Sequence, residues 1–250
     1  MKKTFSKILI AIAFVALSGF MGTNVHAATV TIAITSGTSF STSTDGSPII
    51  VEAYGAGGGG ARTGNEGSAG GGGEYCKSTL SYTSGSTIPI QIGQGGPSGN
   101  NVTNGSPGTA TTWNTNGVVA NGGQGGSYFA LPNGWNSLGG TSGIGTLCYN
   151  GGSTGTNIQA GAGSAGPNSA GGSPPNWYTP GTGGGVYAGN GGTPGTGSSA
   201  GNLYGGGGAG ASGGWGSGPG ANGLLVITFN QASSAPSGPV RRIRFMGITR

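Results

Sequence analysis

Four short stretches of the chain have the apolar patterns that are typical of β-strands. In chain order they are Thr29–Ile34, Pro48–Tyr54, Ser86–Ile92 and Gly223–Phe229. A shorter run, Glu74–Tyr82, is a candidate for a further strand between the second and the third.

The pattern within each stretch predicts how the strand is covered. In the first stretch the apolar side chains alternate and share one face, which predicts a strand with one buried side. The last stretch is apolar on both faces, which predicts a central strand that is covered on both sides. The third stretch contains Pro89, which has no N–H to donate. We therefore expect that strand at a sheet edge or with its N–H side free.

The rest of the mature chain does not have the periodicity of a helix. No apolar pattern with a period of 3.6 residues is sustained, and glycine, which accounts for 63 residues, interrupts every candidate. We therefore expect an all-β fold in which a small β-sheet scaffold carries long glycine-rich loops, with no helix in the mature chain.

Residues 93–223 are of low complexity and consist mostly of Gly, Ser, Thr, Asn and Pro. Recurrent Asn-Gly pairs are typical of tight turns. Glycine also occurs at every third position in short runs, as at Gly189 and Gly192 and at Gly207 and Gly210. In a polyproline II helix, which has three residues per turn, such glycines share one edge, so neighbouring chains can approach there. One expectation is therefore a body packed as a polyglycine II bundle.

The opposite expectation for this region is disorder. Segments rich in Gly, Pro and Ser are often flexible, and ordering a glycine has a large entropic cost. Three features favour order. Charged residues make up only 5% of the chain, whereas disordered regions are often highly charged. Tryptophans are spread through the region, and apolar strands bracket it on both sides.

The N-terminus has the pattern of a bacterial secretory signal. Three lysines precede an apolar stretch, Ile8–Leu17, and residues 25–27 (VHA) fit a cleavage site. The apolar stretch is too short for a good membrane span. We expect residues 1–27 to be a signal peptide, so that the mature protein is periplasmic, on the cell surface or secreted.

Export changes the charge and the chemistry of the working protein. Three of the nine Lys and Arg residues and the single histidine, His26, lie in the signal, so the mature net charge is about +2. Without histidine no Ser-His or Cys-His pair can form, and two cysteines are too few for a zinc site. Glu66 and Glu74 are either a carboxylate pair or isolated surface carboxylates. We expect a protein that is not an enzyme, with no cofactor and no metal.

The stretch PIIVEAYGAGGGG, Pro48–Gly60, contains the spacing of a dinucleotide-binding motif. The pattern G-x-G-x-x-G begins at Gly55, and Glu74 follows 19 residues later. A dinucleotide site needs these glycines to open a helix whose N-terminus binds the pyrophosphate. The glycine-rich residues that follow cannot sustain a helix, so we expect no nucleotide and interpret the glycines as the start of the glycine-rich body.

The two cysteines, Cys76 and Cys148, fit an exported protein. An oxidising compartment permits a disulfide between them, and on the chain-entropy model such a bridge stabilises the fold by about 3–5 kcal/mol. The alternative is a pair of buried free thiols.

Several motifs in combination indicate a known family. A strand runs into AYGAGGGG, another ends in IGQGG, VVANGGQGG follows, and a last glycine run closes in ANGLLVITF. Over residues 29–230 the chain thereby resembles the glycine-rich domains of phage tail and tail-fibre proteins and of related bacterial exported proteins. The resemblance implies a small β-scaffold with glycine-rich loops, a display or adhesion role, and no catalytic residues. The signal peptide departs from the phage members and leaves deposition on the host surface open.

The C-terminal residues differ from this domain, which we place at 28–230. Residues 231–240 have the composition of a linker, and residues 241–250 combine arginines with apolar residues. They are either a frayed terminus or a docking tail for a partner, an anionic glycan or lipid headgroups. Nucleic acid is not expected for so short a basic stretch. The candidate docking residues are Arg241, Arg242, Arg244, Phe245 and Arg250.

Three functions are compatible with these features. The first is an exported structural or surface-display protein that self-assembles, since uncharged strand edges recruit other chains. The alternative is an adhesin of the tail-fibre-tip type, which binds a receptor protein or a glycan through aromatic residues on loops. The third is ice binding by a flat, uncharged bundle. The candidate loop aromatics, each of which can equally be local core, are Trp135, Trp177, Tyr178, Tyr187 and Trp215.

Overall fold

The computed structural model describes residues 28–42, 48–62, 67–100, 103–128, 136–155, 158–195, 199–211 and 216–231. The chain divides into a compact unit, Thr29–Asn230, and a second unit formed by Met1–Ala28 and Gln231–Arg250. The fold described below is that of Thr29–Asn230. The predicted signal peptide, the predicted tail and nearly all of the predicted linker lie outside the described residues.

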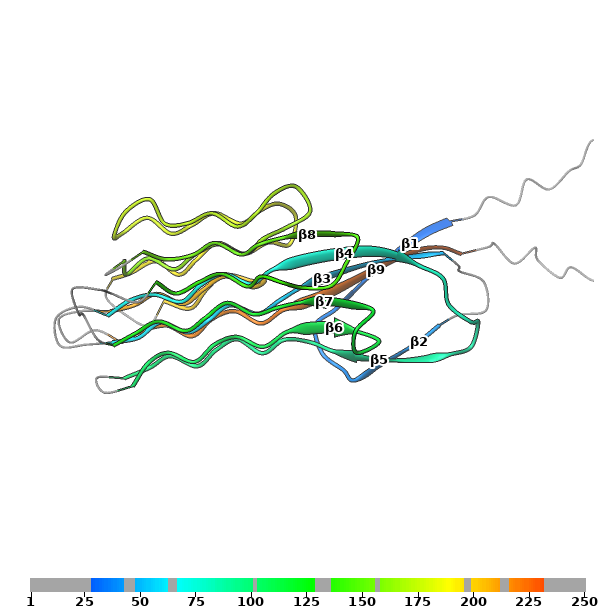
Figure 1. The fold of residues 1–250 in the computed structure, drawn as a ribbon, viewed down its shortest axis with the longest axis horizontal. Coiled ribbons are helices and arrows are strands. Elements are labelled where there is room, and N and C mark those ends of the chain that lie inside the picture. The colour runs from blue at the N-terminus through cyan, green and yellow to red at the C-terminus, as the bar shows by residue number, and fades with distance from the viewer. Residues whose placement is uncertain are drawn as a thin grey trace, which may run out of the picture. The chain divides into compact units, whose positions relative to one another are not determined.

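Five strands form the larger of two sheets, in the order β1-β9-β3-β4-β8 (Figure 1). The pairs β9-β3, β3-β4 and β4-β8 are antiparallel. The strands are β1 (Ala28–Ile34), β3 (Ile49–Tyr54), β4 (Tyr75–Leu80), β8 (Leu147–Tyr149) and β9 (Leu224–Gln231).

Four shorter strands form the second sheet, in the order β2-β5-β6-β7, and all neighbours are antiparallel. They are β2 (Ser39–Ser41), β5 (Thr87–Gln91), β6 (Thr111–Trp113) and β7 (Val118–Ala120). The described residues thus contain two antiparallel sheets and no helix, which confirms the all-β prediction.

The main hydrophobic core lies between the two sheets. Apolar side chains of β3 and β9 pack there against those of β5, β6 and β7, and Phe40 of β2 lies against Trp113 with ring centroids 5.5 Å apart. The largest buried members are Ile49, Val51, Leu225, Ile227, Ile90, Ile92, Trp113 and Val118.

Strand β9 is covered on both faces, as its sequence predicts. Leu225 and Ile227 point into the core between the sheets. Leu224 and Val226 belong to a second buried cluster, with Tyr54, Tyr75 and Ala165, on the opposite face of the sheet. Because β9 lies between β1 and β3, it is also an inner strand of the sheet.

Every strand predicted from the sequence is present, including the fifth candidate, but β2, β6, β7 and β8 are not indicated by the sequence. Each of these has only three residues, which is too short to show an apolar period. The hairpin between β6 and β7 is set by its turn, in which Asn114 and Thr115 have φ values of 50° and 57°. Such values are characteristic of tight hairpin turns.

Of the two placements expected for Pro89, the edge strand is wrong, because β5 lies between β2 and β6, whereas the hydrogen bonds agree with the free N–H side. The N–H of Ile90 donates to Thr38 on the β2 side, so position 89 faces β6 by the alternation of a strand. There Pro89 accepts a hydrogen bond from the Asn114 N–H. A residue with an N–H at position 89 would donate it to the Asn114 carbonyl. Because proline has no N–H, this carbonyl instead accepts the N–H groups of Asn116 and Gly117 within the turn.

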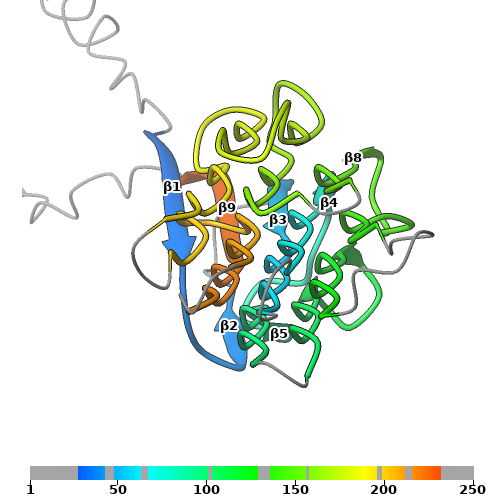
Figure 2. The same ribbon diagram turned by 90° about the vertical axis from the view of Figure 1, so that its left-hand side faces the viewer.

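Beyond the sheets, the strands continue into glycine-rich segments that run side by side (Figure 1). β3 leads into residues 55–61, residues 67–74 lead into β4, and residues 216–223 lead into β9. Figure 2 looks along these segments, which appear as small coils packed next to one another. The described part of this glycine body is therefore ordered, and the described residues after β3, 55–62 and 67–74, contain no helix.

Residues 56–61 show how the glycine body is held together. Their N–H groups point in three directions in turn. Two residues that are three positions apart donate to the same neighbouring segment, at 2.9–3.2 Å. A period of three is that of a polyproline II-type helix. The donor and acceptor pairs are Ala56–Thr109, Gly59–Ser106, Gly57–Ala221, Gly60–Gly218, Gly58–Gly71 and Ala61–Ser68.

The carbonyl groups of residues 56–61 also have a period of three, and they accept N–H groups from three further segments. Residues 56–61 are therefore hydrogen-bonded to neighbours on all sides. The pairs, with the donor second, are Ala56–Gly123, Gly59–Gly126, Gly57–Gly96, Gly60–Gly99, Gly58–Gly208 and Ala61–Ala211. The glycines predicted to share an edge do so: Gly189 and Gly192 both donate to residues 204–207, and Gly207 and Gly210 both donate to residues 159–162.

Candidate functional site

A buried carboxylate, Glu74, lies where the glycine body joins the sheets. The residue directly precedes β4 and is 1% exposed. Its Oε2 accepts the N–H of Asn121 at 3.0 Å and its Oε1 accepts the N–H of Gly143 at 2.9 Å. Burial raises the pKa of the Glu74 carboxyl above its ordinary value, and the two backbone N–H groups oppose that shift. Glu74 thus connects two loops to the start of β4. The sequence singles it out by its spacing from Gly55 and as a possible partner of Glu66, but not for this role.

The disulfide expected from the sequence is present beside this carboxylate. Cys76 and Cys148 are directly opposite residues of β4 and β8, with Cα atoms 4.2 Å apart and an S–S distance of 2.06 Å. The bridge ties the three-residue edge strand β8 to the sheet. The ligand atoms of Glu74, Cys76 and Cys148 lie within 4.8 Å of one another. Because the two sulfurs are bonded to each other, neither is a thiolate that could bind a metal.

Tyrosines cover the outer face of the larger sheet where the glycine body meets it. Tyr54 and Tyr75 contact each other with ring centroids 5.0 Å apart. The Tyr75 hydroxyl donates to Glu52, and Lys77 Nζ lies 4.0 Å from the same carboxylate oxygen. Burial, and then the Glu52 carboxylate, raise the pKa of both buried tyrosines far above the ordinary value. Both phenols therefore stay protonated at neutral pH and act as packing and hydrogen-bonding groups.

Two of the predicted loop aromatics, Trp177 and Tyr178, lie together on one exposed turn, residues 174–180. Their side chains are 42% and 71% exposed, and neither belongs to a buried cluster. The sequence leaves open whether these rings are core or surface, and the structure places both at the surface.

The third described candidate, Tyr187, does not join them. It is 44% exposed, its ring lies edge-on to Tyr54 at 6.4 Å, and its backbone carbonyl accepts from Tyr204. It therefore lies in a turn beside the sheet. Trp135, Trp215 and the tail candidates Arg241, Arg242, Arg244, Phe245 and Arg250 lie outside the described residues, as does Glu66.

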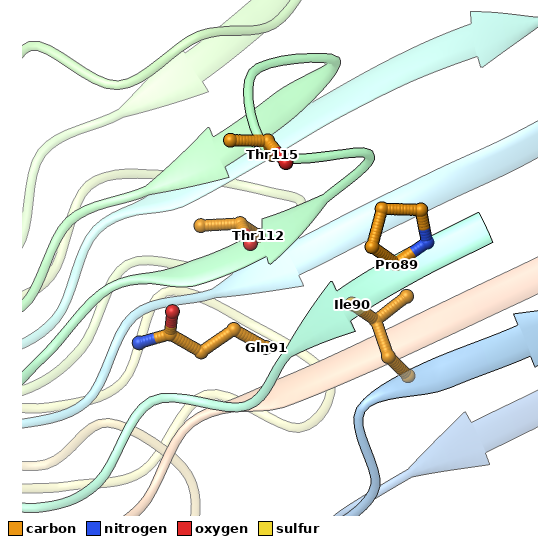
Figure 3. Close-up of a pocket in the computed structure, with 5 residues that line it drawn as sticks. All are labelled: Pro89, Ile90, Gln91, Thr112 and Thr115. Atoms are coloured by element: carbon orange, nitrogen blue, oxygen red, sulfur yellow. The ribbon is translucent and has the colours of Figure 1, made fainter.

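Three hollows on the described surface are lined by uncharged residues. Figure 3 shows one of about 240 Å³ on the smaller sheet, where the amide of Gln91 and the hydroxyls of Thr112 and Thr115 lie around it. Two others, of about 290 and 330 Å³, are lined by uncharged residues as well. These hollows can donate and accept hydrogen bonds but contain no carboxylate, amine or imidazole to transfer a proton.

Among the described residues, no helix is long and apolar enough to cross a membrane.

Comparison with known proteins agrees with this architecture. No curated protein matches the chain significantly. The model of the glycine-rich domain matches residues 33–230, which include all of the described strands except the start of β1 and the end of β9. The chain therefore belongs to the glycine-rich domain family.

Proposed function

We propose that the protein is an exported, non-enzymatic surface-display protein, in which the two sheets are a base and the glycine body is a stiff spacer. One observation carries this proposal: residues 56–61 are hydrogen-bonded to neighbouring segments on every side. A body held by backbone hydrogen bonds in all lateral directions cannot bend at one segment without breaking bonds to several others.

The direction of the glycine segments supports the same function. Arg62 forms a parallel β-bridge with Ala211, and Gly99 donates to Gly60, so the described parts of three segments reach the same level. Figure 1 shows the glycine segments extending away from the labelled strands. The far parts of these described segments are therefore carried at a distance from the base, as a display function requires.

The chemistry of the described residues also fits a structural role. Glu52 and Glu74 are engaged in hydrogen bonds within the fold, and the buried tyrosines stay protonated. The secretory pattern of residues 1–27 and the disulfide agree with an oxidising, extracytoplasmic location.

The display function is tested by placing a short epitope in the full-length precursor between Thr196 and Gly197, which lie in sequence between the hydrogen-bonded residues 189–192 and 201–202. We expect an antibody to bind the epitope on intact bacterial cells, with an unchanged melting temperature of the purified mature protein. The matched control places the same epitope between Gly71 and Gly72, inside the hydrogen-bonded body, and is expected to prevent folding. A tag that is reached only after the cells are lysed would overturn the proposal.

A second candidate function, binding to a cell-surface molecule, is favoured by one observation. Trp177 and Tyr178 are exposed together on a turn, where a purely structural body has no need of two large rings. In that case the display function and the binding function belong to the same molecule.

A further inference from the structure

The turn that carries Trp177 and Tyr178 is held in one conformation. The Oδ1 atom of Asn176 accepts the N–H groups of Tyr178 and Thr179, both at 2.9 Å. This side-chain-to-backbone pattern imitates a backbone turn. Prolines at 174, 175 and 180 flank it and fix their own φ angles. The backbone that carries the two exposed rings is therefore preorganised, and a ligand does not need to order the turn when it binds.

The turn is also fixed to the glycine body. Gly172, on one side of the turn, donates its N–H to the carbonyl of Thr182, on the other side, at 2.8 Å. This bond closes the base of the turn. Both sides of the turn are also hydrogen-bonded to residues 161–163 of the neighbouring segment. Gly172 accepts the N–H of Gly163, and Gly181 donates its N–H to Gly161, each at 2.9 Å. A rigid support of this kind distinguishes the turn from a flexible surface loop whose aromatic residues are exposed by chance.

We propose that this turn is a binding site for neutral carbohydrate, with Trp177 and Tyr178 as the stacking surface and Asn176 and Thr179 as the adjacent polar groups. The face of an aromatic ring is negative and attracts weakly positive C–H groups. A pyranose presents such C–H groups on a flat apolar face that is about the size of an indole ring. The exposed amide and hydroxyl beside the rings match the hydroxyl rim of the sugar.

Charge selects a neutral ligand over an ionic one. The described residues contain four charged side chains, Glu52, Arg62, Glu74 and Lys77. None of these belongs to the turn or to the segments on either side of it. An acidic or basic ligand would therefore lose its hydration at this site without gaining a counter-charge.

Size favours a sugar over a protein partner. A stable protein interface buries about 800 Å² on each side, whereas two aromatic rings bury about 150–250 Å² each. A turn of seven residues is too small to hold a folded partner by itself, but it covers one or two sugar rings. We therefore expect weak affinity for each site, which a surface protein strengthens by presenting many copies.

The site rests on the binding function proposed above, and its test uses the mature protein, residues 28–250. We would titrate it with maltohexaose, cellohexaose and chitohexaose and follow the Trp177 indole N–H resonance, which is assigned from its absence in Trp177→Phe. At least one oligosaccharide is expected to shift this resonance. Because Trp177→Ala lacks this resonance, the affinities of the parent and of the variants are compared by isothermal titration calorimetry. Trp177→Ala is expected to weaken binding about tenfold, as the loss of one stacking ring implies.

The control is Leu203→Ala, which removes a more exposed apolar side chain from another turn and should leave sugar binding unchanged; Leu203 is 65% exposed and Trp177 42%. Melting temperatures of both variants should equal that of the parent, because neither residue belongs to a buried cluster. If none of the three oligosaccharides shifts the resonance, or if both variants bind alike, the site is not a carbohydrate site. The epitope experiment reads cell-surface exposure and not sugar binding, so a failure of display and a failure of this site give different results.

Discussion

Gly57 illustrates what the glycine body requires of a single residue. A Cβ atom built on Gly57 would overlap the backbone carbonyl of Gly206 in the neighbouring segment. Backbone atoms cannot rotate away as a side chain can, so the two segments would have to separate. Their separation would in turn break hydrogen bonds of the kind that Gly57 makes with Ala221.

We therefore expect Gly57→Ala to lower the free energy of unfolding by about 3 kcal/mol or more, since overpacking of a rigid site is strongly destabilising. Chemical denaturation of the mature protein measures this change. Gly155→Ala is the matched control, because the nearest atom to its new Cβ belongs to the flexible side chain of Ile158, at 3.3 Å. Equal losses in the two variants would show that backbone contact is not what requires glycine at position 57.

Glu74 provides a test of electrostatics at the same scale. Its pKa in the folded protein is raised above the usual 4.5. At a pH between 4.5 and this raised pKa, the folded state binds a proton that the unfolded state has released. Stability therefore falls as the pH rises through that window. The contribution of Glu74 is greatest below pH 4.5 and is lost as pH passes the raised pKa.

Glu74→Gln is expected to remove this part of the pH dependence, because glutamine does not titrate. One of the two N–H groups, from Asn121 or Gly143, would then face an NH₂ group in place of an oxygen. Unfolding free energies of parent and variant, measured at half-unit steps from pH 3.5 to 8, test this. Parallel curves would mean that Glu74 keeps the same pKa in both states.

At the scale of the elements, β1 stands out among the strands. It is the outermost strand of the larger sheet and has seven residues, whereas the edge strands β2, β7 and β8 have three each. Its sequence, ATVTIAI, contains no charged residue and no proline. Charges and prolines are the usual means by which proteins prevent one edge from pairing with another.

We predict that the mature protein self-associates through β1, so that its weight-average mass in sedimentation rises with concentration. Ala33→Lys places a charge on this exposed edge and should keep the protein monomeric. Ala170→Lys, an equally exposed alanine in a turn, should behave like the parent. A parent protein that stays monomeric at the highest soluble concentration would contradict the prediction.

At the scale of the whole molecule, the sequence predicts the strands far better than the body. Apolar side chains identify β3 and β9 because their burial needs a pattern that can be read along the chain. The neighbours of a glycine cannot be read in this way, since every glycine offers the same N–H and C=O. Gly57 donates to Ala221 and the next residue, Gly58, to Gly71, and nothing in either residue type distinguishes the two partners.

The candidate site shows the same division. The sequence identifies Trp177 and Tyr178 as aromatic residues on a loop, but their exposure depends on the path of the segments around them. In the sequence Glu74 stands out by its distance from Gly55 and as a possible partner of Glu66, whereas its role comes from the loops at Asn121 and Gly143, which are distant in sequence.

The period of three in the hydrogen bonds also governs how such a molecule can change in length. Inserting one residue in a segment rotates all later N–H groups toward the wrong neighbours, whereas inserting three restores every direction. One additional turn in each segment would extend the body by about 9 Å, at roughly 3.1 Å per residue, with every neighbour preserved. The reach of the protein from its base is therefore adjustable in discrete steps, by triplet insertions or deletions that leave the sheets and the terminal turns as they are.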